Sequence, residues 1–217
     1  GWDIQFRPYL WTADISGTAG VAGVEAPVDV EFSDLLDALD FTWSSTLEVH
    51  KAGGKWTFLL DTFYMKLGPD TPSLIDDIKV EQAIIDPMIA YRLREWNNGR
   101  SWLEVLGGVR WMYLNTEIEA IRGPRLENSE SWWDLHVGLR MRHYFNERLY
   151  GVAGLDYGGF GINSDYVFQG VAGLGYHLRP NLTLDVLYRY FDIDYSDDGF
   201  LWDTETSGIF LGVGFYF

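Results

Sequence analysis

The stretch that decides the fold is ETSGIFLGVGFYF, residues 205–217. Its large apolar side chains recur at every second position, at Ile209, Leu211, Val213, Phe215 and Phe217. Because successive side chains of a β-strand point to opposite faces, this alternation predicts a strand with one fully apolar face. The segment WDIQFRPYL, residues 2–10, has the same period, with its apolar residues at the even positions.

The period-two pattern recurs about ten times along the chain. We expect strands at 2–14, 41–50, 55–67, 80–95, 102–117, 132–145, 149–160, 166–178, 182–193 and 205–217. Several exceed the roughly 5–6 residues typical of strands and reach the roughly 9–11 that cross a bilayer. A soluble sandwich is the alternative, but arginines and acids share the polar faces, which suits an enclosed lumen better than a solvated face.

The expected connections alternate in length. Those at 52–54, 97–101, 146–148 and 179–181 are short, those at 15–40, 68–79, 118–131 and 194–204 are long, and 161–165 is intermediate. Short turns at one end and long loops at the other are typical of membrane barrels. We therefore predict an all-β fold: one domain, 1–217, forming a closed antiparallel up-and-down transmembrane β-barrel of ten strands, with eight or twelve as alternatives. An even strand number puts both termini on the short-turn, periplasmic side.

The first long connection, about 15–40, contains a further alternating segment from Val24 to Phe32. We interpret it as part of an extracellular loop that extends the sheet above the membrane. Ser33 and Asp34 are then expected to cap a short helix. That helix would carry Leu35, Leu36 and Leu39, either folded into the barrel mouth or packed on its rim.

The alternation that ends in Phe215 and Phe217 resembles the C-terminal assembly signal of outer-membrane barrels. In layout the chain resembles small barrels of the OmpA/OmpW type. Its segments PYLW, 8–11, and FSDLLD, 32–37, are similar to a group of uncharacterised Gram-negative outer-membrane proteins. The resemblance implies the bacterial outer membrane, with lipid and lipopolysaccharide as partners and with assembly machinery acting on the last strand. It implies little about activity, and it names no protein partner.

Composition narrows the choice of function. Acids outnumber bases 32 to 16, which argues against a nucleic-acid partner because phosphate binding needs a basic surface. The chain has no cysteine, so disulfides and thiolate metal sites are excluded. No apolar run approaches the roughly 18 residues of a membrane helix. Strand-like sequence starts at Trp2, so we expect a mature form without a signal peptide, and we expect no cofactor.

The alternation sorts the charges. Inward-facing acids are expected at Asp3, Glu48, Asp61, Asp86, Glu104, Asp134, Asp156 and Asp185, and inward-facing bases at Arg7, Arg92, Arg94, Arg110, Arg140, Arg142 and Arg189. Arginine can pair carboxylates in a bidentate fork, so we predict an ion-pair lattice that fills a narrow lumen. The loop-side stretches 14–40, 68–79, 117–130 and 192–205 carry 20 acids and three bases, so the net charge is expected to face outward at that end.

Aromatic residues fall near both ends of the expected strands. Trp2, Trp56, Trp102, Tyr150 and Tyr176 lie towards the short turns, and Trp11, Trp43, Tyr64, Tyr113, Trp133, Tyr157 and Tyr188 lie towards the long loops. Two belts of this kind are expected where amphipathic rings sit at headgroup level.

Two groups could carry chemistry. Asp134, His136, Arg140 and Asp156 share a lumen face, and a histidine beside a carboxylate can act as a general base. No serine is placed to complete a nucleophilic arrangement, so we expect a lattice and no catalytic residues. Asp192, Asp194, Asp197 and Asp198 could hold a divalent cation, but a solvated acidic loop is the default and no metal is expected.

The expected function is that of a non-enzymatic outer-membrane barrel with a narrow or plugged lumen. It would pass a small or apolar solute, or serve a structural or interaction role. The alternatives are a surface-exposed hydrolase-like enzyme, and a barrel that binds cations, lipopolysaccharide or a protein partner.

Overall fold

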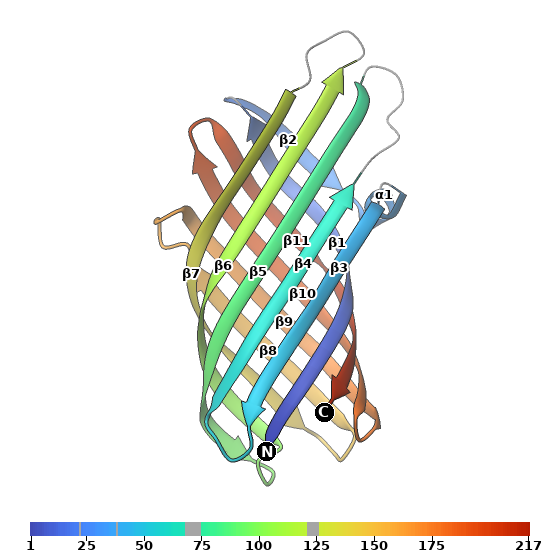
Figure 1. Cartoon of the computed structure of the whole chain (residues 1–217), viewed down its shortest axis with the longest axis vertical. Coiled ribbons are helices and arrows are strands. Elements are labelled where there is room, and N and C mark those ends of the chain that lie inside the picture. Colours follow the sequence, from blue (N-terminus) through green and yellow to red (C-terminus); the bar gives the residue numbers. More distant parts are fainter. Residues whose placement is uncertain (22, 38, 68–74, 121–125) are drawn as a thin grey trace.

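Alternating residues build one antiparallel sheet that closes on itself (Figure 1). The structure is a computed structural model that describes residues 1–217 except 22, 38, 68–74 and 121–125. The elements are β1 (Trp2–Val21), β2 (Val24–Val30), α1 (Phe32–Asp37), β3 (Leu39–Lys51), β4 (Trp56–Leu67), β5 (Ile75–Trp96), β6 (Ser101–Ala120), β7 (Leu126–Tyr144), β8 (Leu149–Gly158), β9 (Ser164–Arg179), β10 (Leu182–Asp197) and β11 (Phe200–Tyr216). None of the helices described is long and apolar enough to cross a membrane.

Ten of the described strands form the closed barrel. From β3 to β11 each strand pairs with its neighbour in the sequence, and β1 pairs with both β3 and β11. The predicted ten-stranded up-and-down barrel is confirmed, and each expected strand is present. We call the end that carries both termini the turn end and the opposite end the loop end (Figure 1).

The strands run further towards the loop end than the alternation predicted. β1 continues to Val21, because its ladder with β11 extends to the pair Gly20–Leu201. β10 and β11 likewise continue as a hairpin to the pair Asp197–Phe200. The expected loops 15–40 and 194–204 are therefore mostly strand. Residues 68–74 and 121–125 of the other long connections lie outside the described residues.

The segment after β1 extends the sheet, as interpreted from the sequence. β2 pairs with residues 15–21 of β1, whereas β3 pairs only with residues 2–8. α1 follows, and the Leu35 amide donates to the Glu31 carbonyl, so Ser33 and Asp34 lie within the first turn of the helix instead of capping it. Leu35 is buried against Ile15, Met65 and Leu67 at the inner edge of the rim. Leu39 begins β3, outside the helix.

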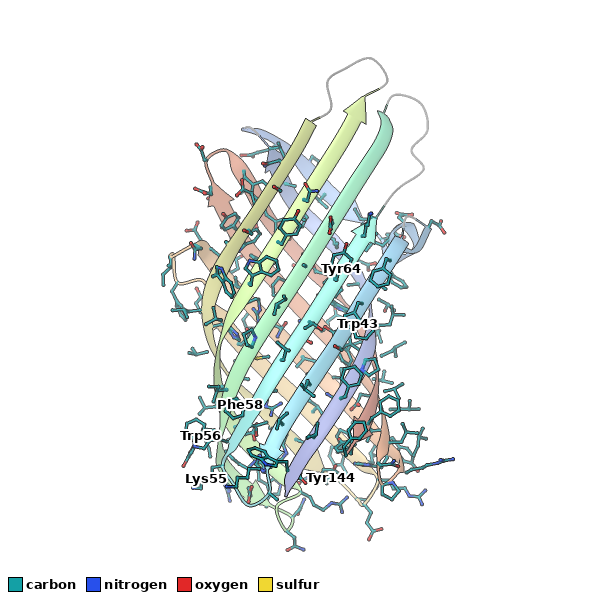
Figure 2. The ribbon with its side chains drawn as sticks, viewed as in Figure 1. Trp43, Lys55, Trp56, Phe58, Tyr64 and Tyr144 are labelled. Atoms are coloured by element: carbon teal, nitrogen blue, oxygen red, sulfur yellow. The ribbon has the colours of Figure 1, made fainter. Side chains whose placement is uncertain are left out.

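The middle of the barrel's outer face is apolar, and aromatic side chains lie on it nearer the turn end and nearer the loop end. Leu135, Val137 and Leu139 on β7 are all exposed. Figure 2 shows Trp56 near the turn end, and Trp43 and Tyr64 further towards the loop end. The two-belt prediction was wrong for Trp11, Trp102 and Tyr150, which are buried. These three have the inward phase of their strands, which distance from the strand end does not reveal.

Candidate functional site in the barrel interior

The inward-facing charges nearer the turn end form a network that we call the turn-side ionic layer. Its ion pairs run across the lumen in the order Arg92, Glu104, Arg140, Glu48, Arg7 and Asp185. The Arg140 Nε donates to Glu104 at 2.7 Å, and the Arg7 Nε donates to Asp185 at 3.0 Å. Tyr150 adds a hydroxyl donor to Asp185 at 2.6 Å. Strands far apart in the sequence are thereby held by charge-assisted hydrogen bonds.

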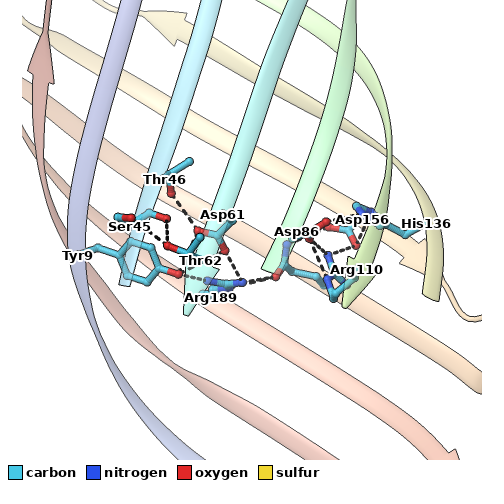
Figure 3. A network of polar contacts seen from close by, with 11 residues as sticks. Tyr9, Ser45, Thr46, Asp61, Thr62, Asp86, Arg110, His136, Asp156 and Arg189 are labelled. Carbon is cyan, nitrogen blue, oxygen red and sulfur yellow. Dashed lines mark hydrogen bonds and ion pairs between the residues drawn. The ribbon is translucent and has the colours of Figure 1, made fainter. Parts of the chain in front are cut away.

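A second network, the loop-side ionic layer, lies further along the lumen (Figure 3). It joins Tyr9, Asp61, Arg189, Gln169, Asp156, Arg110, Asp86 and His136. Arg110 donates to Asp86 and to Asp156, at 2.9 Å in each case. The His136 Nε2 lies 2.8 Å from Asp86, and its Nδ1 lies 3.4 Å from Asp156. Arg189 is 3.1 Å from Asp61 and also contacts Gln169.

A cavity of about 140 Å³ separates the two ionic layers. Its lining includes Arg7 and Glu48 from the turn-side layer and Asp61, Asp156 and Arg189 from the loop-side layer.

Above the loop-side layer the interior becomes apolar. This apolar plug contains Trp11, Ile84, Met112, Trp132, Phe191, Ile193, Tyr195 and Phe200, all buried in one cluster. Trp132 and Tyr195 stack with ring centroids 3.8 Å apart. The sequence analysis missed the plug, although FDIDY at 191–195 signals it. On this stretch the inward residues are apolar and the outward ones are acidic, the reverse of the membrane-facing pattern.

The structure divides the candidate catalytic residues among separate networks. His136 lies between Asp86 and Asp156, and only 2% of it is exposed. Asp134 instead accepts from the Ser164 hydroxyl at 2.6 Å and from the Trp132 indole at 3.1 Å, and both donors are buried. Arg140 belongs to the turn-side ionic layer. Sequence reasoning missed the Ser164 contact, because 30 residues separate it from Asp134.

The structure confirms some of the remaining predictions of inward-facing charges and contradicts one. Asp3 lies exposed at the turn-end mouth, and Arg142 is buried in the interior. The prediction for Arg94 was wrong. It is exposed and lines an outer hollow with Trp96, Leu103 and Met141. A register shift between Arg92 and Arg94 in the β5–β6 ladder turns its side chain outward.

The acidic candidates occupy the outer face near the loop end. In the β10–β11 ladder Asp192 lies opposite Glu205, and Asp194 lies opposite Asp203. The pKa of Asp192 is raised, chiefly by burial and then by the nearby charges of Glu205 and Asp203. A hydrogen bond from the Tyr166 hydroxyl lowers the same pKa. Asp197 and Asp198 lie at the hairpin tip, where Asp198 has φ 39°. Among the described residues no three acids or histidines are grouped so that they could hold a metal ion.

The last strand closes the barrel. The Phe217 amide donates to the Ile4 carbonyl at 2.9 Å, and the Ile4 amide donates back to Phe217 at 3.4 Å. Phe215 and Phe217 are both exposed on the outer face. The two backbone hydrogen bonds of Phe217 therefore join the end of the chain to β1.

Comparison with known proteins supports the fold. No protein-family model and no curated protein sequence matches the chain. Among solved structures, the outer-membrane protease OmpT from Escherichia coli is similar with a TM-score of 0.64 and 12% identity, covering 99% of this chain and 97% of that one. The NalP translocator domain from Neisseria meningitidis matches with a TM-score of 0.49 and 12% identity, covering 100% of this chain and 88% of that one. Ail from Yersinia pestis gives 0.46 and 14%, covering 100% and 99%. At such identities the likeness concerns architecture alone, and the protein has the fold of small bacterial outer-membrane β-barrels.

Proposed function

We propose that the protein is a non-enzymatic outer-membrane barrel with a closed lumen, and that it acts as a structural and interaction element of the cell surface. The observation that carries the proposal is the sequence of barriers inside the barrel. Two ionic layers and an apolar plug follow one another from the turn end to the loop end. The buried His136 and Ser164 offer no reactive group that a substrate could reach.

The outer surface supports the membrane placement and its orientation. The exposed apolar residues Leu135 and Val137 of β7 lie between the exposed aromatic residues Trp133 and Phe145, as expected for a surface in contact with lipid. Long hairpins in such barrels face the outside of the cell and short turns face the periplasm. On this basis the loop end is extracellular and contacts lipopolysaccharide, whereas the termini are periplasmic. The exposed Phe215 and Phe217 are available to the assembly machinery.

The interaction role is assigned to an acidic collar, which we define as Asp192, Asp194, Asp203 and Glu205 on the outer face of β10 and β11. Like charges directly opposite in a ladder destabilise a sheet, so a purely structural surface would gain nothing from the pairs Asp192–Glu205 and Asp194–Asp203. A cationic partner surface would neutralise them. This makes the collar the best-supported contact surface at the loop end.

Complementation of a deletion strain tests the proposal. The wild type should restore outer-membrane integrity, measured as resistance to bile salts. A variant with Asp192→Asn, Asp194→Asn, Asp203→Asn and Glu205→Gln should reach the same level in the membrane but fail to restore it. The variant Asp29→Asn, an exposed acid on β2, is the matched control. Full rescue by the neutralised collar would remove the interaction role.

A second candidate function is passage of an apolar ligand through the barrel wall. In the described part of the chain, residues 9–14 of β1 pair only with β11, so the barrel wall has no backbone ladder between β1 and β3 at this level. Phe32 and Leu35 of α1 fill the gap beside an apolar cavity of about 40 Å³ lined also by Trp11, Ile15 and Met65. Leu35→Ala should then increase binding of an apolar fluorescent probe in vesicles, whereas Leu139→Ala on the far lipid face should not.

A further inference from the structure

One arginine of the interior makes no close ion pair with a described carboxylate. Arg142 is 8% exposed, and no described carboxylate lies within 4 Å of its guanidinium. Its polar contacts are long, 3.4 Å to the Gln5 Oε1 and 3.5 Å to the Tyr216 hydroxyl. The rings of Trp102 and Tyr150 lie 5.3 and 5.0 Å away. Glu48 attracts Arg142 electrostatically from beyond 4 Å. Because that carboxylate is already bound by Arg140 and Arg7, a further anion beside Arg142 would lower the cost of its buried charge.

Two buried donors at the same place are unpartnered. The Arg142 Nε and the Gln5 Nε2 have no hydrogen-bond acceptor among the described residues. Both side chains line a vestibule of about 440 Å³ at the turn end, together with His50, Thr57 and Tyr216. Buried polar groups are nearly always satisfied, and a group left over in a cavity points to something that fills it.

The local charge favours the same sign of ligand. Arg142 lies beside the turn-side ionic layer, and together they contain four buried or nearly buried arginines and the carboxylates of Glu48, Glu104 and Asp185, while the exposed Glu95 pairs with Arg92 at 2.9 Å. Two carboxylates also line the vestibule: Glu48, which is already bound by Arg140 at 3.1 Å and by Arg7 at 3.8 Å, and the exposed Asp3. The turns around this mouth carry Lys51, Lys55, Arg100, Arg148 and Arg179, against Glu147. Since the loop end is acidic, the field of the whole barrel draws anions to this end.

We propose that the turn-end vestibule binds a small oxyanion, a carboxylate or phosphate group, between the Arg142 guanidinium and the Gln5 amide. The planar guanidinium presents paired donors that match an oxyanion. The Tyr216 hydroxyl, 3.5 Å from the Arg142 Nη1, can turn towards the same anion. Trp102 limits movement of the arginine from one side.

Calorimetric titration of the detergent-solubilised full chain with potassium phosphate and with potassium acetate tests the site. The wild type should bind at least one of them with one-to-one stoichiometry. Arg142→Gln should weaken that binding at least tenfold. Arg148→Gln, which removes an exposed arginine from the same end, should bind as the wild type does. Absence of binding by the wild type, or equal binding by Arg142→Gln, overturns the proposal.

Two further measurements keep the test decisive if Arg142→Gln does not fold. Gln5→Leu leaves the guanidinium in place and should weaken binding of the same anion by several-fold. Wild-type crystals soaked in selenate should show an anomalous peak beside the Arg142 Nε, and an empty vestibule contradicts the site. Nanodiscs with and without phosphatidylglycerol separate the sources. Loss of phosphate binding only in the anionic lipid identifies a headgroup as the occupant, and unchanged binding identifies a free anion.

Discussion

Trp132 and Tyr195 lie face to face inside the barrel, with ring centroids 3.8 Å apart and 5° between their planes. Trp132 belongs to β7 and Tyr195 to β10, which are not neighbours in the sheet, so the stack spans the interior. Phe200 packs on both rings. The interior near the loop end is thus packed with apolar side chains, whereas charged side chains occupy the lumen below it.

This arrangement predicts that the intact protein is silent in planar bilayers or shows only small, infrequent openings. Arg110→Ala with Arg140→Ala loosens both ionic layers but leaves the apolar plug, so it should remain silent. Adding Trp132→Ala and Tyr195→Ala should produce measurable conductance. Single-channel recording checks each step, with Trp132→Ala and Tyr195→Ala alone as the control. Steady, porin-sized current from the wild type would refute the closed lumen.

Much of the fold could be predicted from the sequence because strand period is a local property. Alternation located all ten barrel strands, and the inward phase brought most of the expected charges into the lumen. The prediction that Arg94 faces the lumen was wrong, because an irregularity in the β5–β6 ladder reverses the inward and outward alternation there. This irregularity cannot be recognised in the sequence. The prediction that Trp11 and Trp102 belong to the aromatic belts was wrong, because both are buried. Their inward phase, and not their distance from the strand end, determines which way they face.

The partners inside the lumen could not be predicted in the same way. Asp86 and His136 are 50 residues apart, and Arg189 and Asp61 are 128 apart. Which inward charges meet depends on the stagger of the closed barrel, and strand patterns do not determine that stagger. That Arg142 makes no close ion pair is therefore visible only in the structure.

The lipid-facing surface gives a prediction for β7. Val137 is 57% exposed in the middle of the outer apolar row. Val137→Arg should lower the free energy of unfolding by about 2–4 kcal/mol, the cost of a cation near the bilayer midplane. Urea titration in lipid vesicles measures the change, with Val137→Ala as the control. Unchanged stability of the arginine variant would show that this face does not contact lipid.

Substitution of the neighbouring Gly138 should lower stability for another reason. A Cβ at this position would lie 2.3 Å from the Leu155 carbonyl oxygen and 2.7 Å from the Asp156 Cβ. Gly138→Ala should therefore destabilise the β7–β8 pair by crowding, by about 1–3 kcal/mol. The same urea titration reports it, and Gly107→Ala, whose nearest contact is 3.7 Å, is the matched control. Equal effects of the two substitutions would exclude crowding.

The acidic collar, on the part of the β10–β11 ladder next to its hairpin tip, predicts a pH dependence. The pKa values of Asp192 and Asp194 are raised, chiefly by burial and then by neighbouring carboxylates. The folded state therefore holds protons more tightly than the unfolded state, so stability increases as pH falls through the raised pKa towards the usual 3.8. Asp192→Asn with Asp194→Asn should be more stable than the wild type at pH 7 and should lose this advantage below pH ~3.8. An advantage that persists at low pH would contradict the charge mechanism.

Closure of the barrel predicts the effect of shortening the last strand. Phe217 joins β11 to Ile4 through two backbone hydrogen bonds and is 77% exposed. Deleting Phe217 should reduce the amount of heat-modifiable, membrane-inserted protein, whereas Phe217→Tyr keeps both the ring and the backbone bonds and should assemble normally. Electrophoresis of outer-membrane fractions with and without heating measures both. Wild-type amounts after the deletion would separate this residue from assembly.

The loop-side ionic layer predicts a large loss and a specific rescue. Arg110 is fully buried and is bound to both Asp86 and Asp156. Arg110→Met leaves these carboxylates without their arginine partner, so it should lower the free energy of unfolding by about 3–5 kcal/mol. Adding Asp86→Asn and Asp156→Asn removes the unpaired charges and should restore much of the loss, because a neutral interior needs no counter-charge. Urea unfolding in vesicles compares the single and triple variants. A triple variant no more stable than Arg110→Met would mean that Arg110 stabilises the barrel by packing and not by charge.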